Sequence, residues 1–168
     1  MHNYYLTRNE CRCLGPMEWV NNKMVAMIAR TLVNDQKSFG TLNRHIFDPL
    51  FTDKIMSCQE EWKVVDVLMY VMPNVVGHNI THCRLLFFPT LMNFHWFFYC
   101  ADLKTKKLHV LDSLGTSSTD KQQRKLSTLL GDCLVTMLRH LSRWDYSSPF
   151  KFDIVYESVH LQSNCNDC

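Results

Sequence analysis

Three apolar runs rich in aromatic residues follow one another in the middle of the chain, at residues 84–89, 94–102 and 107–112. Aromatic and β-branched residues are typical of β-strands. These runs are apolar at successive positions rather than at alternate ones, and a strand with two apolar faces needs cover on both. We therefore expect a central sheet that is covered on both sides.

Helical periodicity flanks these strands. Apolar residues at helical spacing predict a helix from about Trp19 to Val33, a second at 59–72 that ends at Pro73, and a long third helix at 120–144. A last strand is expected at 152–155. These elements predict an α+β fold in which a central mixed sheet of four or five strands is flanked by helices.

Composition limits the classes of protein. The chain has 168 residues, of which 46% are hydrophobic, and this size fits a single domain over residues 1–168. The net charge of +2 is small, and no Lys or Arg stripe is present to bind nucleic acid. Since no signal peptide or membrane span of about 20 apolar residues is seen, we expect an intracellular protein away from membranes, with its eight cysteines reduced.

His95 and Asp112 are the first candidates for chemistry. They are 17 residues apart, and the segment between them reads as strand, Lys-rich turn and strand. An antiparallel hairpin of this kind brings the start of its first strand beside the end of its second. The two side chains are therefore predicted to be neighbours in space.

Four residue types in this chain fit nucleophilic catalysis. A cysteine thiolate attacks a carbonyl, a histidine takes its proton, a carboxylate orients the histidine, and an amide N–H stabilises the oxyanion. The residues that would fill these roles, in that order, are Cys168, His95, Asp112 and Gln162. Taken singly, each also has a simpler structural explanation, such as a core histidine or an aspartate in a turn.

Zinc binding is the main alternative chemistry. Cys11 and Cys13 with Cys165 and Cys168 supply four thiols, and a second cluster lies at 78–83. Structural zinc sites use closely spaced pairs of ligands with a turn glycine. Neither set has that arrangement, so zinc is the minor interpretation, and no cofactor is expected.

The ordered pattern of these residues resembles a known family. His95-Trp96 is followed by Leu111-Asp112-Ser113, and then by residues 162–168, which read Gln-Ser-Asn-Cys-Asn-Asp-Cys. This pattern is similar to that of the SUMO proteases, in the adenain-like clan of cysteine peptidases. The resemblance implies a papain-like fold with permuted order of the catalytic residues. It also implies cleavage after the C-terminal diglycine of SUMO or a related ubiquitin-like modifier.

A further match lies near the start of the chain. Residues 14–22 resemble the Trp-Leu-Asn-Asp motif that heads the first helix of this family. The resemblance implies that Trp19 and Trp96 flank a narrow channel that admits only glycine, although core packing is the default role of such residues. Asn22 stands where the family has Asp, which is expected to weaken a contact to the modifier.

The family continues after its cysteine with a glycine and a long helix. Because the given sequence stops at Cys168, we expect a domain truncated after the nucleophile, with feeble activity. The expected partners are the modifier and its conjugates, met by a monomer in the nucleus or cytoplasm. Two other functions stay open, an inactive protease remnant and a module that binds the modifier without cutting it. The spacing of Cys165 and Cys168 also predicts a reversible disulfide.

Overall fold

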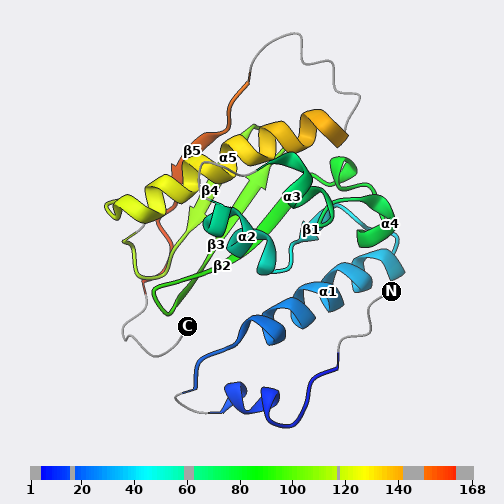
Figure 1. Cartoon of the computed structure of the whole chain (residues 1–168), viewed down its shortest axis with the longest axis vertical. Helices are drawn as coiled ribbons and strands as arrows, with labels where there is room; N and C mark the ends of the chain where they lie inside the picture. The colour runs from blue at the N-terminus through cyan, green and yellow to red at the C-terminus, as the bar shows by residue number, and fades with distance from the viewer. Residues whose placement is uncertain (1–4, 16–17, 59–62, 117, 142–149, 162–168) are drawn as a thin grey trace.

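The computed structural model describes residues 5–15, 18–58, 63–116, 118–141 and 150–161 (Figure 1). Its helices are η1 (Glu10–Leu14), α1 (Asn22–Ser38), α2 (Leu50–Cys58), α3 (Val64–Leu68), α4 (Pro73–Val76), η3 (Ile80–His82) and α5 (Lys121–Leu141). Its strands are β1 (Arg44–Ile46), β2 (Leu85–Met92), β3 (His95–Asp102), β4 (Lys107–Leu111) and β5 (Asp153–Tyr156).

The strands form one mixed sheet in the order β1-β2-β3-β4-β5. The central pairs β2–β3 and β3–β4 are antiparallel, and the outer pairs β1–β2 and β4–β5 are parallel. The register of the central hairpin places Tyr99 opposite Val110 and Phe98 opposite Leu111. The predicted α+β fold with a central mixed sheet is therefore confirmed.

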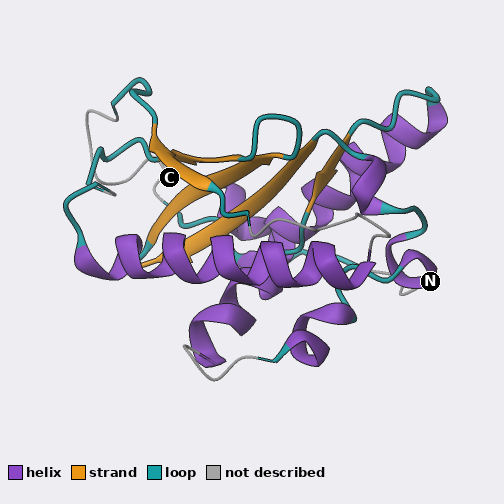
Figure 2. Ribbon diagram, turned by 90° about the horizontal axis from the view of Figure 1, so that it is seen from above, coloured by secondary structure: helices purple, strands orange, loops and turns teal. Residues whose placement is uncertain are grey.

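One face of the sheet carries the core. Alternate residues of a strand point to the same face, and on this face Leu86, Phe88, Phe97, Tyr99, Leu108 and Val110 are at most 1% exposed. Helix α2 contacts β2, and α5 crosses β4 and β5 while contacting α2 and α3. Figure 2 shows these helices on one side of the strands.

The opposite face is less well covered than we predicted. Phe98, in the middle of β3, is 38% exposed, and Leu85, Phe87 and Leu111 are only half-buried. The expected cover on both sides is therefore incomplete on this face, where Phe98 is exposed while Trp96, two residues before it, is 9% exposed. The residues of this face are apolar, but the helices α2 and α5 both lie over the other side of the sheet.

The N-terminal helix starts later than predicted. The side chain of Asn21 accepts a hydrogen bond from the Met24 N–H at 2.9 Å, which makes Asn21 the N-cap of α1. Trp19 consequently lies before the helix and not in its first turn. The helix then continues to Ser38, beyond the predicted end at Val33.

The predicted helix at 59–72 is also wrong in part. Within the described residues of that segment only α3 is helical, and Pro73 begins α4 rather than ending a helix. Proline suits the first position of a helix because that N–H has no partner there. Gly77, at φ +76°, then ends α4 in the left-handed conformation. The elements α2 and β1 were not predicted.

The long helix and the last strand are confirmed within a residue at their described starts. Asp120 Oδ1 accepts hydrogen bonds from the backbone N–H groups of Gln122 (2.7 Å) and Gln123 (2.9 Å), which stabilises the start of α5. None of the helices in the described ranges is long and apolar enough to cross a bilayer.

Two histidines are packed together at the edge of the sheet. The ring centroids of His45, in β1, and His78 lie 4.9 Å apart, and His45 is only 6% exposed. His45 Nδ1 and His78 Nε2 are buried and have no hydrogen-bond partner within the described part of the chain. Burial, with the nearby His78 and Lys37, lowers the pKa of His45 to about 3, and burial lowers that of His78 as well.

This pKa predicts a loss of stability in mild acid. In the unfolded chain His45 takes up a proton below about pH 6.5, whereas in the folded protein it stays neutral down to about pH 3. Protonation of His45 in the unfolded chain favours unfolding, so the folded state is most stable above pH 6.5 and loses stability as the pH drops. Between pH 7 and pH 5, His45 alone should lower the free energy of unfolding by about 2 kcal/mol. Urea unfolding at both pH values measures it. His45→Phe should flatten the dependence, while His160→Gln, at an exposed position, should leave it unchanged.

Candidate active site

His95 and Asp112 meet at one end of the central hairpin. His95 is the first residue of β3, and Asp112 directly follows β4. Because Tyr99 pairs with Val110, the side chains of residues 95 and 112 point to the same, helix-covered face. His95 Nε2 lies 2.6 Å from Asp112 Oδ1, and the two residues are 5% and 4% exposed. The predicted neighbours are thus in direct contact.

The carboxylate of Asp112 is surrounded by donors. Oδ1 also accepts from the Leu114 N–H (3.0 Å), and Oδ2 accepts from the backbone N–H (2.9 Å) and the hydroxyl (3.3 Å) of Thr116. The chain turns around the carboxylate through Gly115, whose φ of +68° suits glycine. An ionised carboxylate is an acceptor only, so all four contacts suit its charged form.

This contact also selects the tautomer of His95. The ring nitrogen that faces a carboxylate carries the hydrogen, so Nε2–H donates to Asp112 and Nδ1 is the basic nitrogen of the neutral ring. The ring lies over Phe97, with centroids 6.1 Å apart and planes inclined by 15°. The imidazole is therefore oriented by a hydrogen bond on one edge and by packing on its face.

Trp96 joins the N-terminal segment to the sheet. Its indole N–H donates to the Val20 carbonyl at 2.8 Å, and the residue is 9% exposed. Trp19, next to Val20, is 43% exposed, and its ring centroid lies 6.4 Å from that of Phe94. The two tryptophans predicted to flank a channel thus lie on segments that meet close to His95.

Three residues that contribute to this region were not predicted from the sequence. Phe94, 78% exposed at φ +60°, forms the β2–β3 turn with Asn93 and presents its ring beside Trp19. The Leu114 amide and Thr116 hold Asp112. The only signal for the last two was the turn-forming Asp-Ser-Leu-Gly-Thr segment, which predicts a turn but not which atom its amides contact.

The remaining predicted site residues are placed as follows. Gln162, Cys165 and Cys168 lie outside the described residues. Asn22 donates to Asp53 Oδ2 at 2.9 Å, while its own Oδ1 is buried without a partner in the described ranges. This position is therefore tied to α2 inside the domain.

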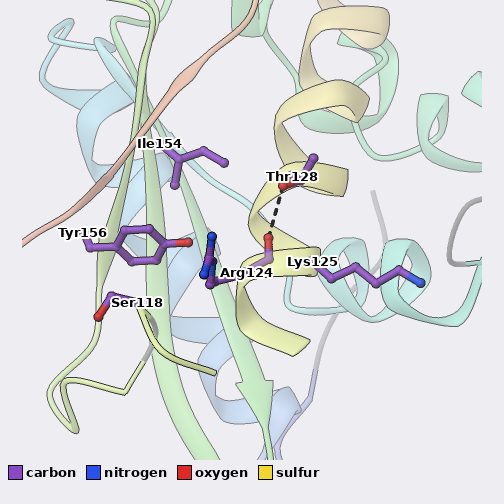
Figure 3. A pocket seen from close by; sticks show the side chains of 6 residues that line it. All are labelled: Ser118, Arg124, Lys125, Thr128, Ile154 and Tyr156. Atoms are coloured by element: carbon purple, nitrogen blue, oxygen red, sulfur yellow. Dashed lines mark hydrogen bonds between the residues drawn. The ribbon is translucent and has the colours of Figure 1, made fainter. Parts of the chain in front are cut away.

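A metal site and a surface hollow are the alternatives to the His95–Asp112 pair. Within the residues that the structure describes, no group of three or more His, Cys, Asp or Glu side chains is arranged to hold a metal ion. A shallow hollow of about 570 Å³ lies between α5 and β5, where the Tyr156 hydroxyl points toward Arg124 while Lys125 points away (Figure 3). Its lining is Ser118, Arg124, Lys125, Thr128, Ile154 and Tyr156. Neither His95 nor Asp112 lines it, so it is not the candidate active site.

Comparisons with known proteins agree with this geometry. Residues 18–168 match the Ulp1 protease family, C-terminal catalytic domain. The ubiquitin-like-specific protease 1A of Arabidopsis thaliana is 24% identical over an alignment of 171 positions, which covers 99% of this chain and 32% of that protein. The chain thus spans about a third of the length of this curated relative.

Solved structures show the same fold. The SUMO protease Ulp1, with its catalytic cysteine oxidised to a sulfinic acid, superposes with a TM-score of 0.74 at 20% identity, over 97% of this chain and 67% of that one. The C-terminal Ulp1 protease domain in complex with Smt3, the yeast ortholog of SUMO, gives 0.72 at 20% identity, over 95% and 65%. A de-sumoylating protease gives 0.63 at 18% identity, over 98% and 63%.

The donors around Asp112 lead to a stability prediction. Both oxygens of Asp112 accept hydrogen bonds from donors. In Asp112→Asn one oxygen is replaced by an NH₂ group, which is itself a donor, so the hydrogen bonds at that position are lost. We expect a loss of about 1–3 kcal/mol in the free energy of unfolding, measured with urea. Asp120→Asn is the matched control, since Asn caps a helix about as well as Asp. Equal midpoints for the two variants would show that the contacts to Asp112 add no net stability.

Proposed function

The chain belongs to the Ulp1 protease family, and on this basis we propose that it is a cysteine peptidase of the SUMO-protease type. Its proposed substrate is the C-terminal diglycine of SUMO or a related ubiquitin-like modifier, in the precursor or in an isopeptide conjugate. The observation that carries the proposal is the buried contact between His95 and Asp112, with the base oriented by a fully hydrogen-bonded carboxylate. The complex of the Ulp1 domain with Smt3 supports the substrate class.

The proposed reaction begins with Cys168. Its thiol gives a proton to His95 Nδ1, and the sulfur attacks the carbonyl carbon of the last glycine. The side-chain amide of Gln162 donates a hydrogen bond to the oxyanion. The tetrahedral intermediate collapses to a thioester as imidazolium returns the proton to the leaving amine. Water, deprotonated by His95, then releases the modifier carboxylate and restores the thiol.

Asp112 and the tryptophans have supporting roles in this proposal. The Asp112 carboxylate holds Nε2–H and stabilises the imidazolium that forms when His95 takes the thiol proton. Trp19 and Trp96 are proposed to flank the channel for the diglycine. The bond from Trp96 to Val20 supports this role, because it fixes both segments next to the base.

A module that binds the modifier without cleavage is the second candidate function. It is favoured by the exposure of Trp19 and Phe94, which offer an apolar surface beside the site. In either case we propose an intracellular monomer, in the nucleus or cytoplasm, whose partner is protein and not nucleic acid. The six cysteines of the described residues, all unpaired, fit a reducing compartment.

The first test of this proposal is labelling by a SUMO whose C-terminus carries a thiol-trapping electrophile. The chain should form a covalent adduct, detected by mass spectrometry after long incubation. Cys168→Ser should abolish the adduct, and His95→Ala should slow it by about 10⁴-fold, since nucleophile and base act as a unit. An adduct that persists in Cys168→Ser would contradict the assignment of the nucleophile. Tight binding of unmodified SUMO with no adduct would favour the binding module.

The second test concerns Trp96. If it flanks the diglycine channel, Trp96→Ala should lower kcat and raise KM for a diglycine substrate, because the substrate is held less well. The matched control is Phe98→Ala, two residues along on the same face of β3 and 38% exposed, which should leave both constants unchanged. Normal constants in the folded fraction of Trp96→Ala, with a large drop in Tm, would show a packing role only.

A further inference from the structure

A side-chain link that the proposed mechanism does not use joins Asp112 to helix α5. The Thr116 hydroxyl lies 3.3 Å from Asp112 Oδ2 and 3.4 Å from Gln123 Oε1. We propose that Thr116 and Gln123 are positioning residues that hold the second carboxylate oxygen of Asp112 and, through it, orient His95. Their catalytic meaning rests on the proposed function, but their effect on His95 can be measured without it.

The hydrogens of this link have one consistent arrangement. A hydroxyl has a single hydrogen, and a carboxylate is a stronger acceptor than an amide oxygen, so Thr116 donates to Asp112 Oδ2. Its lone pairs then accept from the side chain of Gln123. An amide turned by 180° presents NH₂ in place of oxygen, which gives Gln123 the donor that this contact needs. With the Gln123 amide in this turned orientation, the hydrogen bonds run from Gln123 through Thr116 to Asp112.

The backbone of Gln123 is held in place by several hydrogen bonds. The residue is 5% exposed, and its N–H is bound by the capping Asp120. Its carbonyl accepts from the Ser127 hydroxyl at 2.8 Å and from the Tyr99 hydroxyl at 3.3 Å. Burial raises the pKa of Tyr99, so its hydroxyl keeps its hydrogen at neutral pH. The first turn of α5 is thereby fixed to β3, four residues along that strand from His95.

The geometry of the carboxylate explains why this link matters. His95 and the Leu114 N–H both contact Oδ1. Contacts to the other oxygen, Oδ2, therefore restrict rotation of the carboxylate group about its Cβ–Cγ bond. Thr116 holds Oδ2 with its N–H and its hydroxyl. Removing the hydroxyl leaves one of these two bonds. The orientation of the carboxylate toward His95 Nε2 should then be less restricted, but the hydrogen bond to His95 should still form.

The test uses single substitutions in the full chain. Thr116→Val removes the hydroxyl at an exposed position, Thr116→Ser keeps it, and Gln123→Met removes the amide while keeping a similar length. Thr128→Val is the matched control. Thr128 lies on α5, as Gln123 does, but its hydroxyl donates to the Arg124 carbonyl on the exposed side of the helix. The tautomer and the Nε2–H resonance of His95 are read by ¹⁵N–¹H NMR, and the adduct rate by the SUMO electrophile probe.

The expected result is a loss of the Nε2–H signal of His95, by faster exchange, in Thr116→Val and Gln123→Met, with adduct formation slowed about tenfold. Thr116→Ser and Thr128→Val should match the parent in both readouts. Unchanged His95 spectra in Thr116→Val, or an equal effect in Thr128→Val, would overturn the proposal. If Gln123→Met unfolds, Thr116→Val decides. If the parent forms no adduct but Thr116→Val still loses the Nε2–H signal of His95, the proposed function fails and the positioning role stands.

Discussion

The register of β3 against β4 places the two halves of the site. Tyr99 opposite Val110 puts residues 95 and 112 at the same end of the hairpin and on the same face. A slip of one residue in either strand would turn one of these side chains to the opposite face, because strand side chains alternate. The register is strongly specified by burial. Phe97, Tyr99, Leu108 and Val110 are all at most 1% exposed, and a slip would turn those of the shifted strand away from the core.

The charge on Asp112 is the second constraint. A carboxylate that is 4% exposed has lost most of its water, and a buried charge is strongly destabilising unless it is hydrogen-bonded. The turn after β4 meets this need with two backbone N–H groups and a hydroxyl, in addition to the His95 ring. The local turn and the charge thus depend on each other. In return, the buried negative charge acts on His95 with little screening by water.

The parts of this structure that local patterns determine could be predicted from the sequence. The hairpin and the start of α5 follow from runs of apolar residues and from helical spacing, and the His95–Asp112 contact follows from the hairpin. The short elements β1, α2 and α4 depend on tertiary packing and were not predicted. The apolar residues of the second sheet face predicted that it is covered, but Phe98 on that face remains exposed. The contacts of Leu114 and Thr116 depend on atomic positions in a turn. No residue pattern specifies these positions, so the second carboxylate oxygen and its partners emerged only from the structure.

The region around His95 is assembled from segments far apart in the chain. Trp96 and Val20 are 76 residues apart, yet the indole N–H donates to that carbonyl. On the other side of His95, the first turn of α5 reaches Asp112 through Thr116. The N-terminal segment therefore approaches through a backbone carbonyl that any residue could supply, while α5 acts through specific side chains. Substitutions of Val20 should consequently be tolerated where they keep the backbone path, whereas the contacts at Thr116 and Gln123 depend on residue type.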